Sequence, residues 1–114
     1  MSPIKVRSIV GVNAISMNSG RKIYEEVLRL WPRHGKIIID FDGVEVFASP
    51  FFNSSIGVLL KDRSISTLQE RLAFENISEH GRRILNLVID NAIKFYSDQD
   101  GKTDTGLDEV KREL

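Results

Sequence analysis

Two aspartates of this chain are spaced so that their carboxylates could act together in metal binding or proton transfer. Asp40 and Asp42 alternate at the end of an apolar run, so on a strand both carboxylates would point to the same side. Such a pair can hold Mg²⁺ or share a proton. The alternative, which we favour, is structural. In that interpretation Asp42 belongs to an Asp-Gly turn and Asp40 accepts hydrogen bonds from nearby backbone amides.

Ser49 is the second candidate, because it stands directly before Pro50 where a short apolar stretch ends. A serine at the N-cap followed by a proline at the first helical position is typical of a helix start, and losing such a cap costs about 1 kcal/mol. A phosphate added to Ser49 would meet the free N–H groups and the positive end of that helix. It could switch partner binding, although a plain helix cap is the simpler interpretation of the residues alone.

No other catalytic or metal-binding pattern stands out. The chain has no cysteine and two histidines, His34 and His80, which we interpret as solvated surface residues. It lacks a glycine-rich phosphate loop, a G-x-S-x-G motif and an H-E-x-x-H motif. We therefore expect no cofactor, no resident metal ion and no enzymatic activity.

Composition and charge narrow the class of protein further. Of the 114 residues, 41% are hydrophobic and 28% charged, as in ordinary globular domains, and 16 basic residues balance 16 acidic ones. Without a net positive field or a row of cations, we expect no nucleic-acid partner. No apolar stretch approaches the ~18 residues of a membrane span, and no signal peptide is evident. We expect a cytoplasmic protein that does not bind membranes.

Periodicity predicts alternating strands and helices. Ile23, Val27 and Trp31 recur at helical spacing after a capping residue among Ser16, Asn18 and Ser19. A β-branched run at 36–41 indicates a central strand. The remaining predicted elements are strands at 4–10, 44–47 and 72–74, a helix from Ser49 to about Lys61, a helical turn at 66–69 and a long helix opening at Ser78 or Glu79.

This order predicts an α/β fold with a mixed central sheet of about four strands, covered by three or more helices. We divide the chain into one domain at 1–96 and a polar C-terminal tail at 97–114. The tail carries six acidic residues against three basic ones, which leaves it at −3 and the domain at +3. Its Gly, Asp and Thr content is typical of a mobile segment, with room for a short helix near 107–113.

The segment IIIDFDGVEVFASPFF carries a family likeness. It resembles the strand–turn–helix core of the STAS fold, the sulfate-transporter and anti-sigma-factor-antagonist domain. It is more similar still to the STAS-like family of unknown function, whose pattern is Asp-Phe-x-Gly-Val, then Ser-x-Phe, a polar residue and a later glycine. The positions that match are Asp40, Phe41, Gly43, Val44, Ser49, Phe51, Asn53 and Gly57, within a likeness that covers roughly residues 4–96.

The resemblance implies a regulatory module. In anti-sigma-factor antagonists, a serine at the start of the second helix is phosphorylated by a histidine-kinase-type ATPase, and Ser49 falls at the matching position. Antagonists typically have Asp-Ser-Ser-Gly there, whereas this chain has Ala48, Ser49, Pro50 and Phe51. We expect a signalling protein as partner, such as an ATPase of that type, recognised through Ser49, Pro50, Asn53 and Ser54.

Two other functions stay open. Some STAS-fold domains are thought to bind small ligands or nucleotides, and Arg21 at a helix start could form an anion site with the N-terminus of the second helix. Assembly into a homo-oligomer is also compatible with the sequence, with an exposed Phe51 or Trp31 as the expected contacts.

Overall fold

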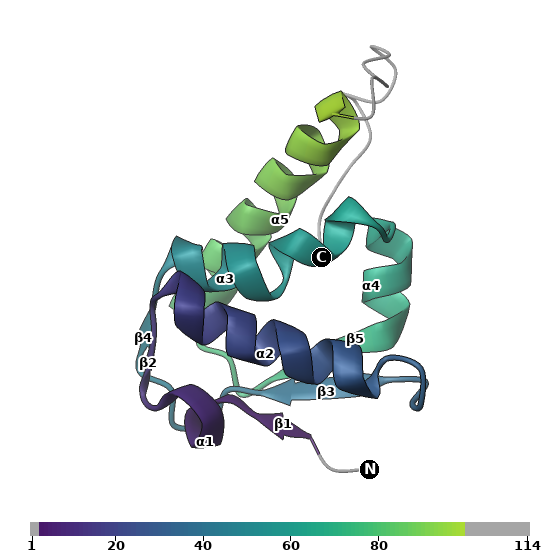
Figure 1. The fold of residues 1–114 in the computed structure, drawn as a ribbon. Helices are drawn as coiled ribbons and strands as arrows, with labels where there is room; N and C mark the ends of the chain where they lie inside the picture. Colours follow the sequence, from purple (N-terminus) through teal and green to yellow (C-terminus); the bar gives the residue numbers. More distant parts are fainter. Residues whose placement is uncertain (1–2, 100–114) are drawn as a thin grey trace.

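The centre of the fold is a parallel sheet of three strands. The computed structural model describes residues 3–99 (Figure 1). In spatial order the strands are β1 (Ile4–Lys5), β3 (Ile37–Asp40) and β5 (Leu72–Glu75). Ile39 pairs with Ile4 on one side and Phe74 on the other. The central place predicted for the run at 36–41 is thus confirmed.

A second parallel sheet has only two strands, β2 (Asn13–Ala14) and β4 (Val46–Phe47). The expected single sheet of about four strands is not confirmed. After β1 the chain forms a short helix, α1 (Val6–Val10), and after β3 it turns at Gly43, whose φ is 84°. Both neighbouring strands are therefore interrupted before β2 and β4 resume the pairing. The predicted strand at 4–10 is wrong beyond its first two residues.

Helices cover one face of the three-stranded sheet. They are α2 (Met17–Leu30), α3 (Ser49–Ser55), the 3-10 helix η1 (Gly57–Lys61), α4 (Ile65–Arg71) and α5 (Glu79–Gln99). Figure 1 shows α2, α3 and η1 on the same side of that sheet. Burial agrees, because Ile37 and Ile39 are fully buried while Ile38 and Asp40 between and after them are only half-buried. The expected cover of three or more helices is confirmed.

Serine side chains begin three of these helices. Ser16 accepts a hydrogen bond from the Ser19 amide at 3.0 Å, and Ser78 accepts one from the Gly81 amide at 3.0 Å. Both serines were among the predicted caps. The third is Ser64, which accepts from the Thr67 amide at 3.1 Å. Each bond satisfies one of the amides that a first turn leaves without a partner.

Three phenylalanines anchor α3 to the sheets. Phe41 follows β3, Phe47 ends β4 and Phe52 lies in α3, and their ring centroids are 5.8–6.0 Å apart. All three are buried. Aromatic pairs at this separation add about 0.5–1.5 kcal/mol beyond the area that they bury. This cluster fixes where α3 starts and which of its faces stays outside.

The long C-terminal helix extends past the predicted domain boundary. The expected boundary lay at residue 96, and α5 continues to Gln99. The rest of the predicted tail, 100–114, lies outside the described residues, as does the short helix predicted near 107–113. The division into a domain and a tail therefore stays a prediction.

Candidate functional site

The predicted recognition residues lie at the start of α3 and along its outer side. Pro50 and Asn53 are exposed, whereas Ser49 and Ser54 are half-buried. The prediction that Ser49 caps this helix is wrong. Ala48 occupies the N-cap with extended backbone, Ser49 is the first helical residue, and no side chain caps the end. The hydroxyl of Ser49 makes no hydrogen bond within residues 3–99.

Arg21 reaches this surface because α2 and α3 pack unusually closely. At the contact stands Gly20, where a Cβ atom would lie 2.3 Å from the Phe51 carbonyl oxygen and 2.0 Å from the Ser54 Oγ. Only a residue without a side chain fits there. The next residue, Arg21, is exposed beside the contact. The close packing therefore brings Arg21 beside α3, and the anion site expected from Arg21 and the N-terminus of the second helix stays a prediction.

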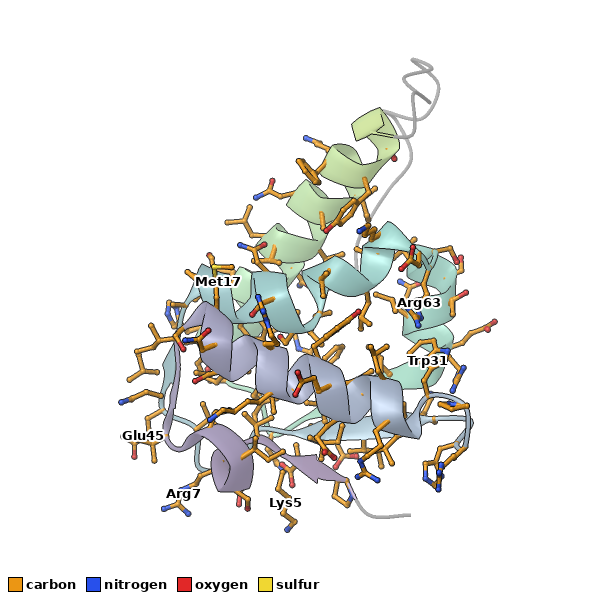
Figure 2. All side chains as sticks on the ribbon, viewed as in Figure 1. Lys5, Arg7, Met17, Trp31, Glu45 and Arg63 are labelled. Carbon is orange, nitrogen blue, oxygen red and sulfur yellow. The ribbon has the colours of Figure 1, made fainter. Side chains whose placement is uncertain are left out.

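The Ser54 side chain links α3 to α2 by a hydrogen bond. Its hydroxyl lies 2.9 Å from the carbonyl oxygen of Met17, at the first turn of α2, and can donate to it. The Pro50 and Phe51 carbonyls of its own helix lie at 3.2 and 3.3 Å. Figure 2 shows the Met17 side chain at this end of α2, beside α3. A partner would meet Ser54 as part of a fixed surface, not as a free hydrogen-bonding group.

A cleft of about 410 Å³ opens where α2, α3, the 3-10 helix and α5 meet. Volumes of this order are typical of small-molecule sites. Its walls combine apolar surface with polar groups from each side; they are Met17, Arg21, Tyr24, Glu25, Asn53, Ser54, Val58 and Tyr96. Three of the predicted site residues, Arg21, Asn53 and Ser54, thus come together here. Ser49 and Pro50 lie one turn earlier on α3 and do not line the cleft.

Two residues of the cleft, Tyr24 and Tyr96, were not predicted from the sequence as site residues. Both repeat at helical spacing with core residues, so they look like packing positions. In the structure both are half-buried and line the cleft. The available signal was the residue type, because tyrosine pairs an apolar ring with a polar tip that favours the boundary between core and water.

The polar groups of the cleft are largely unengaged. Within residues 3–99 the one ion pair joins Arg29 to Glu26, at 2.8 Å, and its hydrogen bonds lower the pKa of Glu26. Arg21 and Glu25 form no such pair although both line the cleft. The side-chain amide of Asn53 and the two tyrosine hydroxyls make no hydrogen bond to the described side chains or backbone of residues 3–97. The cleft can therefore offer donors, an acceptor and aromatic surface to a bound group.

Asp40 has a structural role, in agreement with the interpretation that it accepts hydrogen bonds from nearby groups. Its Oδ1 accepts hydrogen bonds from the Asp42 amide at 2.9 Å and the Asn76 side chain at 2.8 Å. These bonds, led by that of Asn76, together with the charge of Lys5, hold the pKa of Asp40 below its ordinary value. The bond to Asn76 ties the end of β3 to the end of β5.

The alternative of a Mg²⁺ site at Asp40 and Asp42 gains no support. Both line a cavity of about 460 Å³, but two cations, Lys5 and Arg7, line it as well and would compete with a metal ion for the carboxylates. Across residues 3–99 no three Asp, Glu or His side chains gather in a way that could hold a metal. His34 and His80 lie outside any such group.

None of the helices between residues 3 and 99 is long and apolar enough to cross a membrane.

No curated protein and no solved structure matches the chain significantly. Residues 19–82, which run from the first turn of α2 into α5, match the family described as the STAS-like domain of unknown function (DUF4325). That segment contains every recognition residue predicted from the sequence. Such a domain indicates a regulatory or binding module, and the chain belongs to the STAS-like family.

Proposed function

We propose that the chain is a regulatory module that binds a partner protein through the outer side of α3 and the adjoining cleft. The observation that carries this proposal is the cleft itself. There Arg21 and Asn53 stand unengaged beside the rings of Tyr24 and Tyr96. A partner side chain with an apolar body and a negative tip would bury its body between the rings and pair with Arg21.

Phosphorylation of Ser49 would switch this binding. Ser49 and Asn53 are four residues apart on α3 and therefore share a face of the helix. A phosphate on the Ser49 hydroxyl would add up to two negative charges one turn before the cleft. Those charges would repel a partner that brings an acidic group to Arg21. The family likeness favours a histidine-kinase-type ATPase as the partner and as the enzyme that adds the phosphate.

The experiment is affinity capture from the native host with wild type, Ser49→Ala and Ser49→Asp as baits, followed by intact-mass measurement of each recovered bait. We expect wild type and Ser49→Ala to retain the same ATPase or signalling protein and Ser49→Asp to lose it. A fraction of the wild-type bait should carry the mass of one phosphate, and Ser49→Ala should carry none. Equal capture by all three baits, with no phosphate on any of them, would refute the switch.

A matched pair of variants tests the surface separately from the switch. Arg21→Gln removes the cleft cation, whereas Arg83→Gln removes an exposed cation of α5 that lies 13 residues, or about 20 Å, from Tyr96. Both changes alter the net charge equally. Capture that falls for Arg21→Gln and is unaffected by Arg83→Gln supports recognition at the cleft. Equal losses would point to a general effect of charge.

A second candidate is a small anionic ligand in the same cleft, such as a nucleotide. The convergence of Arg21, Asn53 and two tyrosine rings favours it, because a base can stack on a ring while a phosphate pairs with the guanidinium. Guanine and adenine nucleotides at 100 times their Kd would stabilise the native state by about 2.7 kcal/mol, visible as a higher Tm. An unchanged Tm with all nucleotides leaves the partner protein as the ligand of the cleft.

A further inference from the structure

Two arginine guanidinium groups stack on the ring of Trp31, which lies at the C-terminal end of α2. The guanidinium carbon of Arg71 lies 4.2 Å from the ring centroid and that of Arg63 lies 4.7 Å from it. Figure 2 shows Trp31 and Arg63 facing each other across the space between the end of α2 and the start of α4. Stacking on an aromatic face fixes the orientation of a guanidinium.

The two arginines differ in what else they bind. Arg71 donates hydrogen bonds to the backbone carbonyls of Trp31 and Gly35, and to that of His34 at 2.5 Å. These carbonyls belong to the end of α2 and the turn after it, which would otherwise lack partners. Arg71 therefore links α4 to the end of α2, and its Nε and Nη2 donors are engaged there.

The Arg63 guanidinium, in contrast, makes no hydrogen bond to backbone carbonyls of the described chain. The backbone amide of Arg63 donates to the Leu59 carbonyl at 3.1 Å, but among the side chains that the structure describes, those of residues 3–97, its guanidinium makes no hydrogen bond and no ion pair. Its five N–H donors are therefore available to a ligand. It is also half-buried, and its position is set by the stacking on Trp31. A guanidinium that is already held in place loses little conformational entropy when it binds an anion.

Arg63 lines a small pocket of about 150 Å³ between the 3-10 helix, α4 and α5. Hydroxyl groups and apolar side chains make up the rest of the wall, which comprises Leu60, Ser64, Ile65, Ile93, Tyr96 and Ser97. Among the side chains of residues 3–97, no carboxylate lines this pocket, in contrast to the cavity at Asp40 and the cleft at Glu25. A cation and hydroxyl donors without a competing acid are the chemistry that recognises a tetrahedral oxyanion.

We propose that this pocket binds a phosphate group through Arg63, with the Tyr96 and Ser97 hydroxyls as further donors. The volume suits one phosphate and a short organic group, for which Leu60, Ile65 and Ile93 provide the apolar wall. The ligand is therefore inorganic phosphate or a small phosphate monoester. This site shares Tyr96 with the cleft at Arg21 but is centred on a different cation, and it does not depend on the proposed function.

The chain offers a direct probe, because Trp31 is its only tryptophan. Its fluorescence should change saturably when the full chain is titrated with sodium phosphate, and sodium chloride at the same ionic strength should not reproduce the change. O-phosphoserine forms a second arm. Tighter binding of O-phosphoserine than of phosphate would identify a monoester as the ligand, and equal or weaker binding would identify the free ion.

Variants separate a binding role from a structural one. Arg63→Gln should raise the half-saturating phosphate concentration about tenfold or more, the effect of losing hydrogen bonds to a charged group. The matched control is Arg33→Gln, which removes an exposed cation two residues from Trp31 and should titrate like wild type. A wild-type response that chloride reproduces, no response at all, or equal titrations for Arg63→Gln and wild type would each overturn the proposal.

Discussion

At the scale of single residues, serines in similar sequence settings have different roles. Ser16 has extended backbone and its side chain binds the Ser19 amide, so it is a true helix cap. Ser49 is already inside its helix and binds nothing in the described chain, because the extended residue before the helix is Ala48. A serine whose hydroxyl has no structural role is free to serve as a modification site.

This contrast gives a stability prediction. Ser16→Ala should lower the free energy of unfolding by about 1 kcal/mol, the usual cost of losing a cap. Ser49→Ala should change it by less than about 0.5 kcal/mol, as surface substitutions do. Urea denaturation of both variants compares the two. A cost for Ser49→Ala as large as that for Ser16→Ala would restore the capping role that the sequence suggested.

Asp40 should couple stability to acid pH through Asn76. Because the folded pKa of Asp40 lies below its unfolded value, its contribution is complete above the unfolded pKa of about 3.9 and is lost as pH falls through the folded pKa. Asn76→Gly removes the largest cause of that shift, and glycine tolerates the φ of 57° at this position.

The measurement is a carboxyl-carbon NMR titration of Asp40 in wild type and Asn76→Gly. We expect the pKa of Asp40 to rise toward its ordinary value in the variant, with a smaller loss of stability below pH 4. Asn91→Gln, which changes an exposed side chain on α5, serves as the control and should leave the titration unchanged. An Asp40 titration that is the same in all three proteins would contradict the assigned cause.

At the scale of elements, the contact between α2 and α3 positions the candidate site. Gly20→Ala should lower the free energy of unfolding by about 1–3 kcal/mol, because its new methyl group would collide with the backbone of Phe51 and with Ser54. Gly35→Ala is the matched control, since no atom lies within 4 Å of its added Cβ. Urea denaturation should separate the two variants, and a Gly20→Ala protein as stable as Gly35→Ala would mean that the helices are not closely packed.

Long elements could be predicted from the sequence and short ones could not. The helical spacing of Ile23 and Val27 and the β-branched run at 36–41 extend over enough residues to reveal their period. Strands β1, β2 and β4 have two residues each, which is too short for any alternation to show. The sequence therefore predicted one longer first strand, missed β2 entirely, and joined β4 to the main sheet.

The candidate site was predictable only in part, for a related reason. Arg21, Asn53 and Ser54 were predicted because of their place near helix starts and in the family pattern, and they line one cleft. Tyr24 and Tyr96 lie far apart in the sequence and meet only through tertiary packing. Likewise, Arg63 gains its setting from the stacking on Trp31, which no local pattern encodes.

At the scale of the whole molecule, the cavities described above differ in charge. The cavity at Asp40 pairs two acids with two cations and the cleft at Arg21 has one of each, whereas the described side chains give the pocket at Arg63 a cation alone. Opposite charges that surround one cavity partly cancel each other, whereas a lone cation attracts anions. This difference supports the two proposals made above, a partner protein at the cleft and a small oxyanion at the pocket by α4.

The most direct test of the central claim is site-specific photocrosslinking in the native host. A photoreactive phenylalanine derivative replaces Asn53 at the cleft in one variant and Arg83 on α5 in another, both of which are exposed positions. We expect a single protein adduct from position 53, none from position 83, and loss of the first adduct when Ser49→Asp is added. Adducts from position 83 alone, or the same adducts from both positions, would contradict recognition at the α2–α3 surface.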